Sequence, residues 1–261
     1  MQSIVEHKIH SLHEYVELLE NQYSDNEFSR WVYRGHADHT FELMPSIGRH
    51  FPRGLDSANR ERSILTIFKK TCEPVAPERI SNDLDWLAFA QHHELPTRLL
   101  DWSSVPTIAL YFCCREHEDR DGHVYALFAE QSLSSKRYET EDPFKIRKAH
   151  KFVPPPALAP RLKAQHGVFT IQPKATLPLD EDLPRDWILE KITVPASAKL
   201  EIRKSLFRLG VDEATLFPDA GGIARHIKWR HLEIRSSLRQ RSAPQSETGN
   251  GITALKKTVP D

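Results

Sequence analysis

The stretch WVYRGH, residues 31–36, has the apolar and aromatic composition of a buried strand but ends in a charged group. Arg34 places a planar, permanently charged guanidinium where turn residues usually stand. Gly35 then allows the backbone to bend sharply or to approach a ligand closely. The pattern predicts that Arg34 reaches an anion at the end of this strand.

The composition is that of an ordinary globular protein. The chain has 261 residues and is 39% hydrophobic, which permits a normal packed core. Lys plus Arg balance Asp plus Glu at 36 each, so no overall charge draws the chain to nucleic acid or to anionic membranes. The three cysteines (Cys72, Cys113 and Cys114) do not suit a disulfide framework. No stretch resembles a signal peptide or a bilayer span, so we expect a cytoplasmic protein without membrane contact.

Helical and strand-like segments mix along the chain without regular alternation. Caps and apolar spacing predict helices at about 12–21, from Asp56 or Ser57 to Pro74, and at 81–93, 107–114, 162–165, 196–209 and 223–238. Strands are predicted at 30–34, 97–104, 123–128, 167–171 and 188–194, and a charged loop at 131–151. We therefore predict one α+β domain over residues 1–241, with a central, largely antiparallel sheet flanked by helices. Residues 242–261 have little to bury and are expected to form a disordered tail.

A second stretch, QHHELPTRLLDWSS at residues 91–104, concentrates polar side chains around an apolar pair. Polar groups in such a run need partners, because burying them without hydrogen bonds is costly. Asp101 has two candidate partners, Arg98 nearby and Arg34 on the earlier strand. A buried salt-bridge network that only fixes a turn explains the stretch as well as a binding site does.

Four segments together resemble the FRG domain family, which is named for its aromatic-Arg-Gly motif. They are YRG at 33–35, QHHELPTRLLDWSSVPTIALYFC at 91–113, RLKAQHGVFT at 161–170 and LFPDAGGIA at 216–224. Their order and spacing carry the resemblance, which covers roughly residues 10–235. The last segment departs from the family, which tends to show Leu and Asp where Ala220 and Gly221 stand here. The family is known mainly from bacterial and phage proteins and names a domain rather than a reaction.

The resemblance implies one pocket built from the family's recurring polar positions and two glycines. These correspond here to Arg34, Gly35, His92, Thr97, Arg98, Asp101, Gln165, Gly167 and Asp219. Guanidiniums, carboxylates, a hydroxyl and an amide suit a phosphorylated or nucleotide-like ligand. Of these we expect Arg34, His92, Asp101 and Gln165 to be catalytic and the others to bind ligand together with Tyr33.

FRG proteins are also distantly similar to NAD-dependent ADP-ribosyltransferases. On this likeness NAD is the substrate, and Arg34 grips its phosphates. The nicotinamide ribose would be ordered by Thr97 or Ser103, and the nicotinamide stacked on Trp102 or Tyr111. The catalytic glutamate of the late strand has no unambiguous match, and the candidates are Gln165, Gln172 and Glu190.

Two other function classes stay open. A hydrolase or nuclease-like toxin would use Asp101 and Asp219 as carboxylates and His92 as general base. A non-catalytic module would capture an anionic ligand, with the basic last helix (223–241) contacting nucleic acid or a partner. No metal is expected, because the histidines and cysteines lack zinc-like spacing. The macromolecular target is not predicted, and a role in bacterial defence or toxicity rests on family association only.

Overall fold

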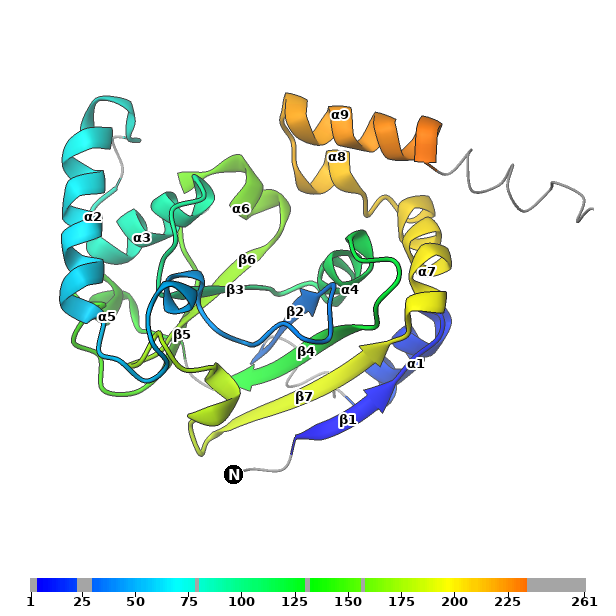
Figure 1. Cartoon of the computed structure of the whole chain (residues 1–261), viewed down its shortest axis with the longest axis horizontal. Coiled ribbons are helices and arrows are strands. Elements are labelled where there is room, and N and C mark those ends of the chain that lie inside the picture. Colours follow the sequence, from blue (N-terminus) through cyan, green and yellow to red (C-terminus); the bar gives the residue numbers. More distant parts are fainter. Residues whose placement is uncertain (1–3, 23–29, 78–79, 130–131, 156–157, 234–261) are drawn as a thin grey trace, which may run out of the picture.

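The computed structural model describes residues 4–22, 30–77, 80–129, 132–155 and 158–233 (Figure 1). The expected tail at 242–261 and the end of the expected basic helix lie outside these ranges, so the domain limits stay a prediction. Within the described ranges, no helix is both long enough and apolar enough to cross a membrane.

The described strands form one seven-stranded sheet in the order β1-β7-β4-β2-β3-β6-β5. Their bounds are β1 Val5–Lys8, β2 Trp31–His36, β3 Leu99–Ser103, β4 Gly122–Ala129, β5 His150–Phe152, β6 Gly167–Ile171 and β7 Trp187–Val194. Only β1 and β7 run parallel, and every other neighbouring pair is antiparallel. The predicted α+β class with a largely antiparallel sheet is confirmed.

The sheet splits between β2 and β3. These strands pair only through Tyr33 and Ser103, whereas β2 pairs with β4, and β3 with β6, along their whole lengths. Beyond this single pair the two strands diverge, with Arg34 on one edge and Asp101 on the other. Unpaired backbone groups at such an edge need other partners, and side chains from both strands meet there.

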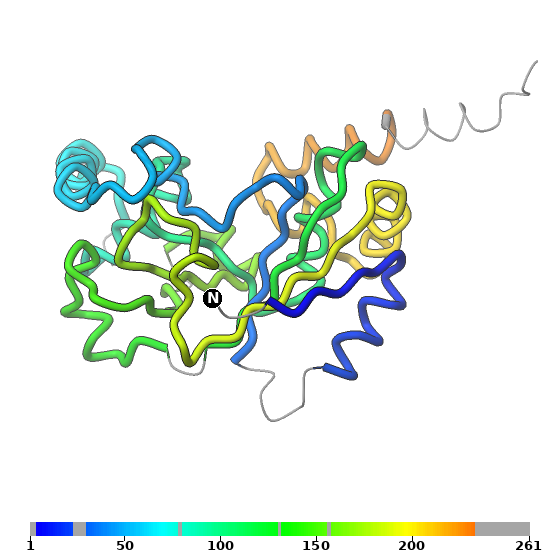
Figure 2. Tube along the Cα trace, turned by 60° about the horizontal axis from the view of Figure 1, so that its bottom comes forward, coloured from blue at the N-terminus to red at the C-terminus, as the bar shows by residue number. Residues whose placement is uncertain are grey.

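Helices cover the sheet on both sides of the split (Figures 1 and 2). Their bounds are α1 Leu12–Gln22, α2 Ala58–Cys72, α3 Asp83–His92, α4 Pro106–Arg115, α5 Ser135–Thr140, α6 Pro160–Ala164, α7 Ala196–Arg208, α8 Glu213–Leu216 and α9 Ala220–Lys228, with 3₁₀ turns that include η2 Ser46–His50. One apolar cluster joins β2, β4 and β7 to α1, α4 and α7, and another joins β3, β5 and β6 to α2 and α3. A third, with Val32, Leu100 and Leu127, crosses the split.

Gly35 takes part in close packing rather than in a sharp bend. A Cβ atom on Gly35 would lie 2.0 Å from the Ala109 carbonyl oxygen and 2.6 Å from the Cys113 backbone nitrogen, both in α4. The missing side chain therefore lets α4 lie directly on β2. The close approach that the sequence predicts is thus made to a helix, while the residue also borders the pocket described below.

Several element predictions were wrong in detail. The segment predicted as a loop at 131–151 contains α5, whose cap is Ser134, and the start of the edge strand β5. The helix predicted at 81–93 begins at Asp83, and its N-cap is Asn82, which accepts from the Asp85 amide. Strand β1 was not predicted. Strands of three or four residues such as β1 and β5 are too short to show a period in sequence.

Candidate functional site

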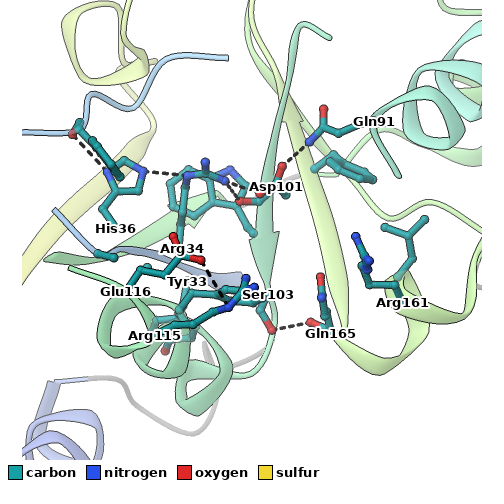
Figure 3. A pocket seen from close by; sticks show the side chains of 18 of the residues that line it. Tyr33, Arg34, His36, Gln91, Asp101, Ser103, Arg115, Glu116, Arg161 and Gln165 are labelled. Carbon is teal, nitrogen blue, oxygen red and sulfur yellow. Dashed lines mark hydrogen bonds and ion pairs between the residues drawn. The ribbon is translucent and has the colours of Figure 1, made fainter. Parts of the chain in front are cut away.

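A pocket of about 440 Å³ opens where β2 and β3 diverge (Figure 3). Its volume lies in the range of small-molecule sites. The charged residues that line it are Arg34, Arg49, Arg115, Arg161, Asp101 and Glu116. Because four guanidiniums face two carboxylates, the lining carries an excess of positive charge. Its aromatic residues are Tyr33, Phe41, Trp102, Phe112, Phe169 and Phe217.

Arg34 bridges the split in the sheet. One terminal nitrogen, Nη1, donates to the Asp101 backbone carbonyl at 2.5 Å and to its carboxylate at 2.6 Å. The Nε atom donates to His36 Nε2 at 3.0 Å. Burial, assisted by the charge of Arg34, lowers the pKa of His36 to about 3, so the imidazole is neutral. Its Nε2 therefore accepts from Arg34 while Nδ1 donates to the Phe41 carbonyl at 3.2 Å.

Asp101 is held from the opposite side by the Gln91 amide, which a hydroxyl holds in turn. The Gln91 side chain at the end of α3 donates to Asp101 Oδ1, and the Thr97 hydroxyl donates to Gln91 Oε1. Thr97 in turn accepts from the Leu99 backbone amide at 3.2 Å. A chain of hydrogen bonds thus runs from Thr97 to His36 and fixes both groups of the ion pair. Thr97 itself lies behind this chain and does not line the pocket.

Arg49 is the least constrained of the four guanidiniums. It stands on η2 and, among the residues that the structure describes, makes no hydrogen bond or ion pair. Partial burial lowers its pKa from the usual value, and the neighbouring positive charge of Arg34 lowers it further. Arg34 and Arg49 therefore bring two positive charges to the same space, where the Asp101 carboxylate is bonded to Arg34 and Arg49 has no bonded anion among the described residues. This arrangement favours the binding of an anionic group.

The other end of the pocket is built around Phe217. The guanidinium carbons of Arg115 and Arg161 each lie 4.7 Å from the centre of this ring, a distance typical of cation–π contacts. Arg115 is also held by the buried carboxylate of Glu213 at 3.1 Å. Arg161 has a looser ion pair, 3.5 Å from Asp219.

Two buried nitrogens at this end have no hydrogen-bond partner within the described part of the chain, His92 Nδ1 and Arg161 Nε. Burial lowers the pKa of His92, and the charges of His93 and Arg161 add to this effect. A neutral imidazole at this position is able to donate to or accept from a ligand.

Gln165 lies between this end and the split. It is the C-cap residue of α6, two residues before β6 begins. Its backbone carbonyl accepts from the Ser103 hydroxyl at 2.8 Å, and its side-chain amide donates to the Leu216 carbonyl at 3.1 Å. The two other candidates for the late catalytic residue lie elsewhere. Gln172 donates to backbone carbonyls beyond β6, and Glu190 on β7 contacts His7. Of the three, Gln165 is the one that lines the pocket.

The pocket brings together most of the residues predicted for it. Those that line it are Tyr33, Arg34, Gly35, His92, Asp101, Trp102, Ser103 and Gln165. Those that do not are Thr97, Arg98, Tyr111, Gly167 and Asp219.

Arg98 is the clearest correction, because its side chain is fully buried and bonded to Glu61 at 2.8 and 3.2 Å. The partner of Asp101 is therefore Arg34. Tyr111 is also buried and donates to Glu213 at 2.6 Å, so its ring does not reach a ligand.

Sequence reasoning missed several residues of the lining, chiefly Arg49, Arg115, Glu116, Arg161 and Phe217. Arg161 and Phe217 stand inside two of the four segments that carried the family resemblance, which was the signal available. Glu116 and Arg115 follow an apolar helix and resemble an ordinary solvated helix end. Arg49 follows Gly48, which packs so closely that a Cβ atom on it would lie 2.1 Å from the Ala175 carbonyl oxygen. This tertiary contact of the turn, which the local sequence does not reveal, accompanies the placement of Arg49 at the pocket.

Comparison with known families matches residues 29–122 to the FRG domain. This range contains β2, β3 and α4, with Arg34, Arg49 and Asp101, and precedes Arg161 and Gln165. No curated protein and no solved structure matches the chain. Residues 29–122 of the chain are therefore matched to the FRG domain, which the resemblance of the sequence motifs had led us to expect.

Proposed function

We propose that the pocket binds a nucleotide-like ligand through its phosphates, and that this ligand is NAD, whose bond between nicotinamide and ribose is cleaved. The observation that carries the proposal is the pair of Arg34 and Arg49, since Arg49 faces the pocket with no partner among the described residues. A diphosphate beside them would give Arg49 the anionic partner that it lacks among the described residues and would accept charge-assisted hydrogen bonds.

The rest of the lining supports a ligand with planar rings. Phe217 lies against the guanidiniums of Arg115 and Arg161, and Phe112 is its aromatic neighbour at 6.0 Å between ring centres. Aromatic and guanidinium faces both stack on nucleobases. The position of Gln165 before a late strand also agrees with the likeness to ADP-ribosyltransferases. Its uncharged amide would hold the ligand rather than stabilise a cation.

The chemistry needs little from the protein beyond positioning and a compensating charge. When the bond from ribose C1′ to the pyridinium nitrogen breaks, the electron pair stays on nitrogen and neutral nicotinamide leaves. The ribose carbon becomes electron-poor and is attacked by water or by a target nucleophile, which then loses a proton. A site that orients the ligand and excludes free rotation lowers the barrier to this step.

The test is calorimetric titration of the purified protein with NAD, ADP-ribose and nicotinamide, followed by chromatography for released nicotinamide. NAD and ADP-ribose are expected to bind and nicotinamide alone to bind far more weakly. Arg49→Ala should weaken both dinucleotide ligands. The matched control is Arg53→Ala, because Arg53 pairs with Glu42 and Glu181 outside the lining. Equal affinity in wild type and Arg49→Ala would exclude this phosphate site.

A second candidate function is ligand capture without catalysis. It is favoured by Gln165, because this candidate for the late catalytic residue lines the pocket and its amide carries no negative charge. Binding of NAD without any release of nicotinamide would decide for this alternative.

A further inference from the structure

A negative charge near the developing cation would stabilise the transition state in which the bond between ribose C1′ and nicotinamide breaks. The pocket lining contains two carboxylates, Asp101 and Glu116. Gln165 cannot supply this charge. The choice between the two carboxylates follows from what each is already bonded to.

Both carboxylate oxygens of Asp101 already accept hydrogen bonds from other side chains of the protein. One carboxylate oxygen accepts from Arg34 at 2.6 Å, and the other accepts from Gln91. Its charge is compensated directly by the guanidinium, and its orientation is fixed from both sides. Turning Asp101 toward a ribose would break the contacts that close the split in the sheet, so its role is to position Arg34.

Glu116 has a fixed backbone and a loosely held side chain. It is the C-cap residue of α4, and its carbonyl, with those of Ala37 and His117, receives the buried amine of Lys199. Its carboxylate is 59% exposed and 3.5 Å from Arg115 Nε, the one side-chain contact that it makes within the described residues. Arg115 is itself anchored by Glu213 at 3.1 Å.

Figure 3 draws Glu116 turned toward Arg115 and on the same side of the pocket as Arg34. The carboxylate thus lines the pocket beside Arg115, whose guanidinium is 3.5 Å away and is itself held more closely, at 3.1 Å, by Glu213. A negative charge in that place is free to compensate a cation that forms on the ligand.

We propose that Glu116 is the catalytic carboxylate of this pocket, an inference that rests on the proposed function. Its negative charge faces the ribose as the C1′–N bond breaks and nicotinamide leaves with the electron pair. Water then adds its oxygen to C1′, and its proton passes to the Glu116 carboxylate and on to solvent. The products are nicotinamide, ADP-ribose and one proton.

The experiment compares wild type, Glu116→Gln and Glu118→Gln for NAD affinity and for nicotinamide release. Glu118 is the matched control, since it lies on the same loop, is similarly exposed, and is outside the lining. Glu116→Gln is expected to bind NAD with unchanged affinity and to lower kcat by about 100-fold or more, as removal of a charge aimed at a transition state does. Glu118→Gln should behave as wild type, and Glu116→Asp should keep part of the activity.

Three results would overturn the inference. The first is unchanged kcat in a folded Glu116→Gln protein. The second is wild-type protein that binds NAD but releases no nicotinamide, which leaves the binding function standing. The third is wild-type protein that does not bind NAD, which removes the proposed function as well.

Discussion

Arg34 binds Asp101 twice, through the backbone carbonyl and the carboxylate, at the point where β2 and β3 cease to pair. A side chain thus takes the place of ladder hydrogen bonds across the middle of the sheet. Because the same guanidinium faces the pocket, stability of the split and recognition of an anion depend on one residue.

Replacement of Arg34 by lysine is expected to lower affinity for NAD by about tenfold or more, because an ammonium keeps the charge but loses the planar fork. The measurement is calorimetric titration. Arg49→Lys is the matched comparison and should lose less, since Arg49 makes no bond within the described chain that lysine would have to reproduce. Wild-type affinity in Arg34→Lys, combined with lower thermal stability, would identify Arg34 as structural only.

Arg98 is expected to matter for stability and not for the ligand. It is buried with Glu61 and donates to the Pro143 carbonyl, so Arg98→Ala should lower the free energy of unfolding by about 3–5 kcal/mol by leaving an unpaired buried carboxylate. Urea denaturation measures this change. The double variant Arg98→Met with Glu61→Leu should recover much of it. A folded Arg98 variant with greatly weakened NAD binding would contradict this separation.

Gly35→Ala is expected to destabilise the fold strongly, by about 4 kcal/mol or more, because the new methyl would overlap the backbone of α4. Gly167→Ala is the control. A Cβ on Gly167 would meet the Leu162 side chain at 3.3 Å, and a flexible side chain moves aside more easily than a helix backbone. Thermal unfolding ranks the two, and equal melting temperatures would show that α4 can shift away from β2.

The buried His36 predicts a pH dependence of stability. Its pKa is lowered from the ordinary value near 6.5 to about 3 in the folded protein, so between these values the unfolded chain binds more protons. The contribution of His36 to the free energy of unfolding is therefore greatest above pH 6.5, and it decreases as the pH falls toward 3. His36→Gln keeps an acceptor for Arg34 and should flatten this dependence, whereas the exposed His13→Gln should not. A parallel slope in all three proteins would refute the assignment.

Local patterns of apolar residues and turn residues predicted the strand at 30–34 and the extended stretch at 97–104, whereas their meeting in one pocket was implied by the family resemblance. The sequence did not distinguish Arg98 from Arg34 as the partner of Asp101. Side chains alternate between the two faces of an extended segment, so Arg98, just before β3, is buried with Glu61 of α2 while Asp101, three residues on, lines the pocket. Only the packing of α2 decides which of the two faces is buried. Arg49 was missed because only tertiary packing places it at the pocket, and Glu116 because a charged residue after an apolar helix resembles an ordinary solvated helix end.

The two halves of the sheet are joined across the split by one backbone pair, by Arg34 and by apolar side chains such as Val32 and Leu100. Apolar contacts have no preferred direction, so this seam resists separation more than it resists twisting. A ligand that contacts Arg34 on one half of the sheet and Arg161 on the other would restrict the twisting of the two halves against each other. Binding of a ligand in the pocket should therefore slow amide hydrogen exchange along the seam, even at residues that no atom of the ligand contacts.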